Sequence, residues 1–343
     1  MRMLSNWLRT GAWWIAAALC VLGCSEKTTP VVTVYTALDE EFSKPIFEEF
    51  TKATQIEVRS KYDAESTKTV GLTEAILAER QRPRCDLFWN NEILNTLRLE
   101  RAGQLRPFTP PGVDAFPAKD RSPQGLWYGF AARARVLIVN TNQVPEERRP
   151  KSIMDLTDPQ WGDRCGMAKP LFGTTATQAA CLFAAWGDDK AKDFFRAVKR
   201  NAKIKAGNRQ VAEAVGANSM AFGLTDTDDA MVELEKGSPV AIVYPDQGPQ
   251  QIGTLFIPNT LALIKGAPHE KEAEKLMEYL LSADVEARLA AGPSAQIPLR
   301  PGVAASKKVK TPEEVRAMDV DWAAAAAKWD STAEFLKNEF TAP

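Results

Sequence analysis

Histidine is nearly missing from this chain of 343 residues, which contains only His269. Catalysis by a Ser-His-Asp or Cys-His arrangement is therefore excluded unless His269, at the polar start of an expected helix, lies in a cleft. The chain also lacks a CxxC metal pair and the GK[ST] ending of a phosphate-binding P-loop. Its formal net charge of −1 gives no reason to expect nucleic acid or an anionic membrane surface as a partner.

The hydrophobic run near the start of the chain, Ala12–Leu22, is too short for a comfortable membrane span. Arginines precede it and Gly-Cys follows, which is typical of a secretory signal, here over residues 1–23. The end of the run, VLGC, resembles a bacterial lipobox. That resemblance implies an exported chain, held on the periplasmic side of a membrane by lipid on Cys24. The alternative is an ordinary signal peptide cut nearby. Residues 24–30 are expected to form a polar tether.

Three cysteines remain beyond Cys24, namely Cys85, Cys165 and Cys181. Exported proteins meet an oxidising compartment in which disulfides persist, and an odd number leaves at least one thiol without a partner inside the chain. We expect Cys165 and Cys181 to pair, with one on a strand and the other on the helix that folds back over it.

β-Branched runs alternate with stretches of helical periodicity along most of the chain, which predicts an α/β fold with parallel sheets covered by helices. Segment 269–292 is expected to form one long amphipathic helix. Segment 127–141 is unusually long for one strand, so we expect it to cross between two lobes. The expected division is lobe 1 at 31–130 with 246–300, and lobe 2 at 131–245 with 301–343.

Polar groups follow many of the expected strands. Open α/β sheets bind ligands beyond the carboxyl ends of their strands, so these groups are candidates for one site between the lobes. Each alone fits a helix cap or a turn equally well. The candidates are Thr36, Asp39, Trp89, Asn91, Glu92, Gly173, Thr174, Thr175, Asn208 and Tyr244.

The segment MAFGLTDTDDA is a short apolar run that ends in three carboxylates within four positions. Carboxylates cap helix N-termini, or they line a ligand site at the end of a strand. Both interpretations stay open here, and we expect at least one carboxylate to face the cleft. The residues concerned are Thr225, Asp226, Thr227, Asp228 and Asp229.

Two arginines, Arg133 and Arg135, lie two positions apart on the expected crossing strand. Side chains two apart on a strand point to the same face. There, one or both would neutralise the acidic cluster or bind a ligand carboxylate. The alternative is a solvated strand edge.

Residues 31–303 resemble the ferric-ion-binding branch of the periplasmic solute-binding proteins of ABC importers. The resemblance rests on VVTVYTALDEEFSKPIFEEFTKATQIEV, CDLFWNNE, GFAARARVLIVNT and GTLFIPNTLALIKGAPHEKEAEKLMEYLLSADVEARLA. It implies a two-lobed periplasmic-binding-protein fold, in which two Rossmann-like lobes are joined by crossing hinge strands. It also implies delivery of a small ligand to a permease and ATPase complex. We expect no enzymatic activity, no nucleic acid partner and a monomer.

The resemblance also implies positions for the ligands of the ion. Ferric binders of this family use a histidine after the first strand, a glutamate after the third and two adjacent tyrosines after a later strand. Here Asp39 takes the histidine position, Asn91 the glutamate position with Glu92 beside it, and Thr227 and Asp228 the tyrosine positions. The tyrosine pair is therefore absent.

The anion contacts of the family survive better. Gly173 and Thr174 match the family's helix-start site, Asn208 matches another anion contact, and Glu92 and Thr225 take the positions of two more. The resemblance therefore implies an anion bound beside the metal ion.

Oxygen donors of this kind suit Fe³⁺ and other hard metal ions. The expected metal ligands are Asp39, Glu92 and Asp228, and the expected cargo is Fe³⁺ or another metal ion with a synergistic anion, without a resident cofactor. An organic cation such as a polyamine, with Trp89 and Tyr244 giving cation–π contacts, or a small oxyanion such as a phosphonate is the alternative. A secreted carboxylate-dependent hydrolase is a lesser alternative, because the chain lacks the aromatic-rich groove expected for sugars.

Overall fold

The computed structural model describes residues 29–64 and 67–341. The expected signal peptide, most of the tether and the lipid site at Cys24 lie outside these residues. Within them, no helix is both long and apolar enough to cross a bilayer.

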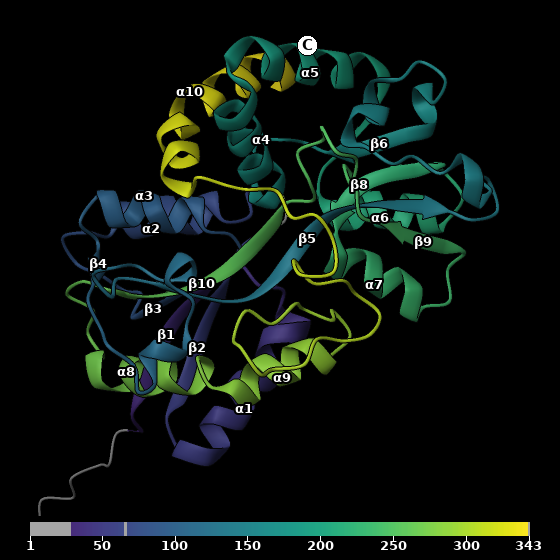
Figure 1. Ribbon diagram of the computed structural model, residues 1–343. Coiled ribbons are helices and arrows are strands. Elements are labelled where there is room, and N and C mark those ends of the chain that lie inside the picture. The colour runs from purple at the N-terminus through teal and green to yellow at the C-terminus, as the bar shows by residue number, and fades with distance from the viewer. Residues whose placement is uncertain (1–28, 65–66, 342–343) are drawn as a thin grey trace, which may run out of the picture.

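One continuous sheet runs through both lobes of the molecule (Figure 1). Its strand order is β2-β1-β3-β10-β5-β8-β6-β7, with β4 and β9 paired beside this path. The α/β class and the two-lobed arrangement predicted from the sequence are confirmed. We call the part built on β1–β4 and β10 lobe 1, and the part built on β6–β9 lobe 2.

Lobe 1 places parallel strands at one edge of its sheet, and β10 runs antiparallel beside β3. Helices α1, α8 and α9 cover one face, and α2 and α3 cover the other. The strands are β1 (Val31–Thr36), β2 (Glu57–Tyr62), β3 (Leu87–Asn90), β4 (Leu105–Arg106) and β10 (Phe256–Ile264). The helices are α1 (Glu40–Thr54), α2 (Val70–Ala78), α3 (Leu94–Arg101), α8 (Glu270–Leu280) and α9 (Ala283–Ala291).

Lobe 2 repeats this layered construction. Helices α4, α5 and α10 cover one face of its sheet, and α6 and α7 cover the other. Helix α10 also contacts α3 of lobe 1. The strands are β6 (Cys165–Ala168), β7 (Lys203–Lys205), β8 (Phe222–Asp226) and β9 (Val240–Val243). The helices are α4 (Gly173–Trp186), α5 (Asp188–Asn201), α6 (Asn208–Gly216), α7 (Thr227–Glu235) and α10 (Trp322–Thr341).

Strand β5 (Tyr128–Asn140) belongs to both lobes, as the length of this segment predicted. Residues 128–134 pair with β10 of lobe 1, and residues 135–140 pair with β8 and β9 of lobe 2. All thirteen residues of the strand are buried. β5 is therefore the backbone link around which the cleft between the lobes is built.

A bulge interrupts β5 just before its two arginines. The pairing with β10 skips Ala131, whose φ of 40° lies in the left-handed region and costs a non-glycine residue roughly 1–2 kcal/mol. Glu286 offsets this cost, because its Oε1 accepts a 2.7 Å hydrogen bond from the Ala131 amide. Asn259 donates a second bond to the Ala131 carbonyl. The bulge changes which side chains face which layer, immediately before Arg133.

Two predictions about local structure are wrong. The expected single helix over 269–292 is two helices, α8 and α9, because Ser282 adopts an extended backbone and its Oγ caps the amide of Val285. The expected disulfide is also absent: Cys85, Cys165 and Cys181 are all free and buried. Cys165 packs in the lobe 2 core beside Leu156, whereas Cys181 faces the cluster that α4 shares with lobe 1.

Burial keeps these thiols protonated and unreactive, since it raises the pKa of Cys165 to about 12 and also raises the pKa values of Cys85 and Cys181. In a soluble chain beginning at Ser25, we expect no reaction with a thiol reagent while the protein is folded. After unfolding without reductant, all three thiols should react. Titration of a single thiol would show that two cysteines pair in solution.

Candidate functional site

Residues from both lobes enclose a small polar cavity beside the middle of β5. The space inside is about 20 Å³, which is enough for one water-sized group. Lobe 1 contributes residues after β1 and β3 and before α2, and lobe 2 contributes the starts of α4, α6 and α7. The lining residues are Asp39, Lys68, Asn91, Arg133, Ala168, Lys169, Phe172, Gly173, Thr174, Thr175, Ala206, Gly207, Asn208, Asp226, Asp228 and Asp229.

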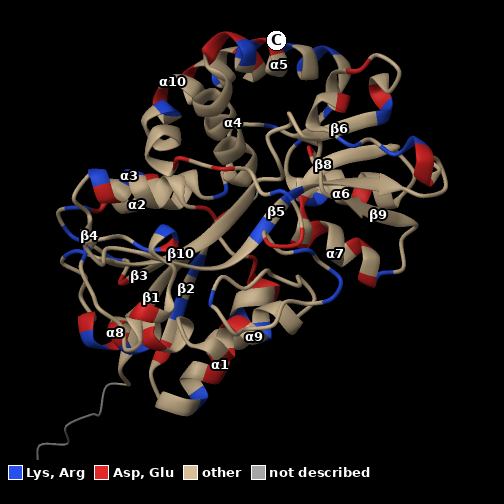
Figure 2. Ribbon diagram, in the orientation of Figure 1, with Lys and Arg blue, Asp and Glu red and all other residues tan. Residues whose placement is uncertain are grey.

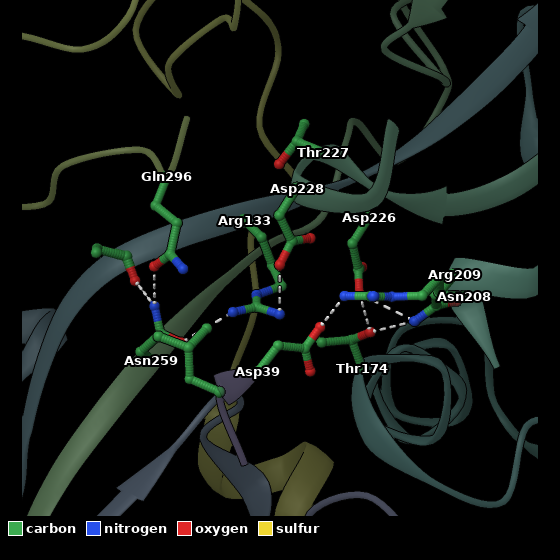
Figure 3. Close-up of polar contacts among 12 residues, drawn as sticks. Asp39, Arg133, Thr174, Asn208, Arg209, Asp226, Thr227, Asp228, Asn259 and Gln296 are labelled. Atoms are coloured by element: carbon green, nitrogen blue, oxygen red, sulfur yellow. Dashed lines mark hydrogen bonds and ion pairs between the residues drawn. The ribbon is translucent and has the colours of Figure 1, made fainter. Parts of the chain in front are cut away.

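Two buried ion pairs form the base of the site. Arg133 Nη1 lies 2.8 Å from Asp228 Oδ2 (Figure 3), and Arg135 Nη1 lies 2.7 Å from Asp226 Oδ1. Figure 2 shows basic residues on β5 in the middle of the molecule. Arg133 is 3% and Arg135 0% exposed. A buried charge needs a partner of opposite sign, so each arginine holds its aspartate in place. The expectation that the two arginines neutralise the acidic cluster is met.

The Arg135–Asp226 pair is fixed further by the start of α4 and α6. Thr174 Oγ1 donates to Asp226 Oδ2 at 2.5 Å, and Asn208 Nδ2 donates to the same oxygen at 2.9 Å. Arg135 also donates to Gln178 and Asn208. The side chains of Thr174 and Asn208 are thus committed to the protein. The amides of Thr174 and Thr175, in the first turn of α4, form no hydrogen bond within the described residues.

Three polar atoms of the lining are buried without a hydrogen-bond partner among the described residues: Asn91 Oδ1, Asp228 Oδ1 and Arg133 Nε. Buried polar atoms of folded proteins are almost always paired with protein, water or ligand. Asn91 comes from lobe 1 and Asp228 from lobe 2. The cavity therefore offers two oxygen acceptors, one from each lobe, to whatever occupies it.

Asp39 bridges the lobes through charge. Its Oδ1 lies 2.5 Å from Lys68 Nζ, and its Oδ2 lies 2.8 Å from Arg209 Nη2 of α6, which also pairs with Glu41. Burial disfavours the ionised form of Asp39, but the charge and hydrogen bond of Lys68 together with the charges of Arg209 and Arg133 outweigh burial, so the pKa of Asp39 is lowered. Asp39 is therefore an ionised link between the two halves of the cleft.

Asp226, Asp228 and Asp229 each place one carboxylate oxygen within 4.8 Å of the others. Burial raises the pKa of Asp228, and the charge of Arg133 opposes this rise. Burial and then the charge of Asp228 raise the pKa of Asp229 well above its usual range. The cluster thus has the spacing of a metal-ligand group, and two of its members, Asp228 and Asp229, hold a proton more tightly than a free aspartate does.

The structure places many of the predicted site residues around this one cavity. Those that line it are Asp39, Asn91, Arg133, Gly173, Thr174, Thr175, Asn208, Asp226 and Asp228. Thr36, Thr225 and Thr227 lie close by but bond to the backbone: Thr36 to Leu38, Thr225 to Asn208 and Thr227 to Ala134.

The two aromatic side chains predicted to contact a ligand lie outside the cavity. Trp89 is fully buried between Phe47 and Phe130 in the lobe 1 core. Tyr244 stacks on Phe256, and its hydroxyl accepts a bond from the Lys310 amide. The proposed cation–π role of both rings is therefore wrong for this cavity.

Glu92 also lies away from the lining, so the expected metal set of Asp39, Glu92 and Asp228 is not assembled. Its carboxylate is used structurally: it accepts bonds from the Leu94 and Asn95 amides at the start of α3, and from Thr177 of α4. The carboxylate cluster that the structure does assemble contains Asp226 and Asp229 in addition to Asp228.

Sequence reasoning missed Lys68, Lys169 and Arg209. Lys68 and Lys169 line the cavity, and Arg209 binds Asp39 from α6. Asn208 was a candidate because it stands at an expected helix start. Arg209 follows it directly, so this same helix start could have identified Arg209. Lys68 had no such signal, because it stands in a loop before α2.

Similarity to known proteins agrees with this geometry. Residues 94–328 match the family described as "Bacterial extracellular solute-binding protein". The chain is 26% identical to "Iron uptake protein A1" of Synechocystis over 292 residues, covering 81% of this chain and 78% of that protein. It is 24% identical to the "Major ferric iron-binding protein" of Neisseria meningitidis serogroup A over 321 residues, covering 88% and 90%.

A solved structure of an iron-bound protein has a similar fold. The crystal structure of iron-bound HitA from Pseudomonas aeruginosa superposes with a TM-score of 0.81 at 25% identity, covering 90% of this chain and 99% of that one. The family match extends over more than half of the chain and includes β5, α4, α6 and α7, the strand and lobe 2 helices that line the cavity. The protein therefore belongs to the bacterial extracellular solute-binding protein family, whose members bind solutes for transport and are not enzymes.

Proposed function

We propose that this protein is the ligand-capturing component of an ABC importer and that ferric iron is the first candidate for its cargo. The observation that carries this proposal is the cluster of Asp226, Asp228 and Asp229 in a cavity closed by both lobes. The iron-binding names of its relatives support the choice of metal. Carboxylate oxygens are ligands that hard cations prefer.

The unpartnered oxygens give the capture step its geometry. Asn91 Oδ1 and Asp228 Oδ1 come from different lobes, so a cation bound between them bridges the cleft. Asp229 adds a third oxygen once it loses its proton. A ligand that contacts both lobes binds the closed form more tightly than the open form and shifts the population towards closure. The lobes that would move as bodies are residues 31–130 with 246–300, and 131–245 with 301–343.

An anion would bind beside the metal. The amides of Thr174 and Thr175 at the start of α4 point to that role, since helix N-termini favour negative charge. Lys169 also lines the cavity and adds positive charge to it. The two tyrosines of the ferric binders are absent from this chain. An anion at this position would supply ligand atoms in their place and complete the coordination of the metal ion.

The proposal includes the position of the protein in the cell. Export is favoured by the signal-like residues 1–23, and lipid on Cys24 would hold the chain at the membrane on the periplasmic side. A tethered monomer there meets the permease and ATPase complex that receives its cargo. This part of the proposal rests on the sequence pattern and on the family.

A small oxyanion, such as a phosphonate that also carries an amine, is the second candidate cargo. The charges of the cavity favour it over a polyamine. Lys68, Lys169 and Arg133 line the cavity, and Arg135 and Arg209 pair with two of its four carboxylates. With Glu41, the second partner of Arg209, five basic groups balance five acidic ones, so the site has no excess of negative charge for a polyamine. An amine of the same ligand would bind the Asn91 and Asp228 acceptors.

Binding of each cargo can be measured by thermal shift with metal-stripped protein. Fe³⁺ supplied with citrate or carbonate should stabilise the wild type by about 2.7 kcal/mol at 100 times its Kd. Asp229→Asn, which leaves both ion pairs intact, should weaken Fe³⁺ binding at least tenfold, and Asp228→Asn should weaken it further. The exposed Asp189→Asn is the matched control. If Fe³⁺ gives no shift and 2-aminoethylphosphonate does, iron is rejected in favour of the second candidate.

The raised pKa of Asp229 should leave a pH signature in the ligand-free protein. The folded chain holds this proton more tightly than the unfolded chain, in which an aspartate has a pKa of about 3.9. The stability that the proton contributes is complete below that value and is lost as pH rises through the raised pKa. Asp229→Asn cannot ionise, so its free energy of unfolding in urea should fall less over this range. Equal slopes for variant and wild type would contradict the shift.

A further inference from the structure

Lys68 enters the cavity from the loop that precedes α2, and its side chain is only 15% exposed. Its ammonium lies 2.5 Å from Asp39 Oδ1. Its carbonyl accepts a 3.0 Å hydrogen bond from the amide of Gly173, the first residue of α4 in the other lobe. One residue of lobe 1 thus contributes both a positive charge to the cavity and a backbone contact that closes the cleft.

The charge of Lys68 reaches the carboxylate cluster as well as Asp39. Lys68 lines the same cavity as Asp228 and Asp229. Burial raises the pKa values of these two aspartates, and the positive charge of Lys68 opposes both rises. Asp226 and Asp228 already have arginine partners, whereas Asp229 has no ion pair within the described residues. Lys68 therefore supplies positive charge where a bound metal ion would supply it.

The cations at this site differ in how firmly they are held. Arg133 and Arg135 stand on a buried strand and bond to Asn259 and Gln178 respectively. Lys68 stands on a loop, and an ammonium is a compact charge on a flexible stem. Of these three, Lys68 is the one that an incoming cation can displace with the least disturbance of the fold.

We propose that Lys68 is a specificity-determining residue: its ammonium pairs with Asp39 inside the cavity that Asp228 and Asp229 also line, so that the cleft rejects bare metal ions and accepts ligands that bring their own oxyanion. This inference rests on the proposed capture of cargo in the cleft and narrows the class of that cargo. A ferric ion then enters as an anionic complex, with Lys68 as a contact of the anion.

The test compares Lys68→Met, which keeps the length of the side chain and removes its charge, with the wild type. The probe is Mn²⁺ as its chloride, titrated calorimetrically into metal-stripped soluble protein. Mn²⁺ should bind Lys68→Met at least tenfold more tightly than wild type. Lys68→Arg, which restores the charge, should return the affinity to the wild-type value. Lys52→Met, an exposed lysine of α1, is the matched control and should change nothing.

For a second probe, Fe³⁺–citrate, the substitution should change the affinity in the opposite direction. Fe³⁺–citrate should bind Lys68→Met several-fold more weakly than wild type, because the anion loses a contact. Equal Mn²⁺ affinities in wild type and Lys68→Met, or absence of Mn²⁺ binding in both, would overturn the inference. Fe³⁺–citrate that binds to both proteins with the same affinity would overturn it as well. Circular dichroism checks that each variant folds. A wild type that ignores Fe³⁺–citrate, together with tighter Mn²⁺ binding by Lys68→Met, would reject iron as cargo and retain the role of Lys68.

Discussion

The pairing of Arg133 and Arg135 with Asp228 and Asp226 is the interaction on which the cleft depends. Both arginines come from the strand that the two lobes share, and both aspartates come from the junction of β8 with α7. A buried guanidinium without its partner would be strongly destabilising, so each pair fixes the start of α7 against β5. The Ala131 bulge and its bonds to Glu286 and Asn259 hold the strand in the register that brings these arginines inward.

The same pairs change how the acidic segment should be understood. Asp226 and Asp228 are neither plain helix caps nor free metal ligands, because one oxygen of each is already bound by arginine. Within the acidic segment, a ligand can still bind to the second oxygen of Asp228 and to the carboxyl of Asp229. This donor set is poorer than that of a tyrosine-bearing ferric site, and it explains why charge balance has to enter any account of the cargo.

Much of the architecture was predictable from the sequence. Alternating strand and helix patterns gave the α/β class, and the length of segment 127–141 gave the crossing strand, because backbone period and burial are local properties. The cavity was partly predictable, since the ends of parallel strands meet at one edge. Asp39, Asn91 and Asp228 follow three such strands and do line it.

What could not be predicted depends on side-chain direction and on contacts between lobes. Trp89 lies near the end of β3, but alternation along this strand directs its side chain into the core. Glu92 follows β3, and its carboxylate accepts hydrogen bonds from first-turn amides of α3 that have no partner within the helix. Lys68 and Arg209 reach Asp39 from elements distant in sequence. The expected disulfide failed for a similar reason, because Cys165 and Cys181 face different clusters.

The position of β10 in lobe 1 has a consequence for synthesis and folding. β3 pairs with β10, yet all strands of lobe 2 separate them along the chain. The sheet of lobe 1 therefore cannot close until β10, about 170 residues after β3, is available, and until then β3 presents an open hydrophobic edge that invites aggregation. Lobe 2, whose β6, β7, β8 and β9 follow one another, can assemble first. Completion of the shared sheet is then a late, long-range step, which makes slow maturation of this protein a property of its strand order.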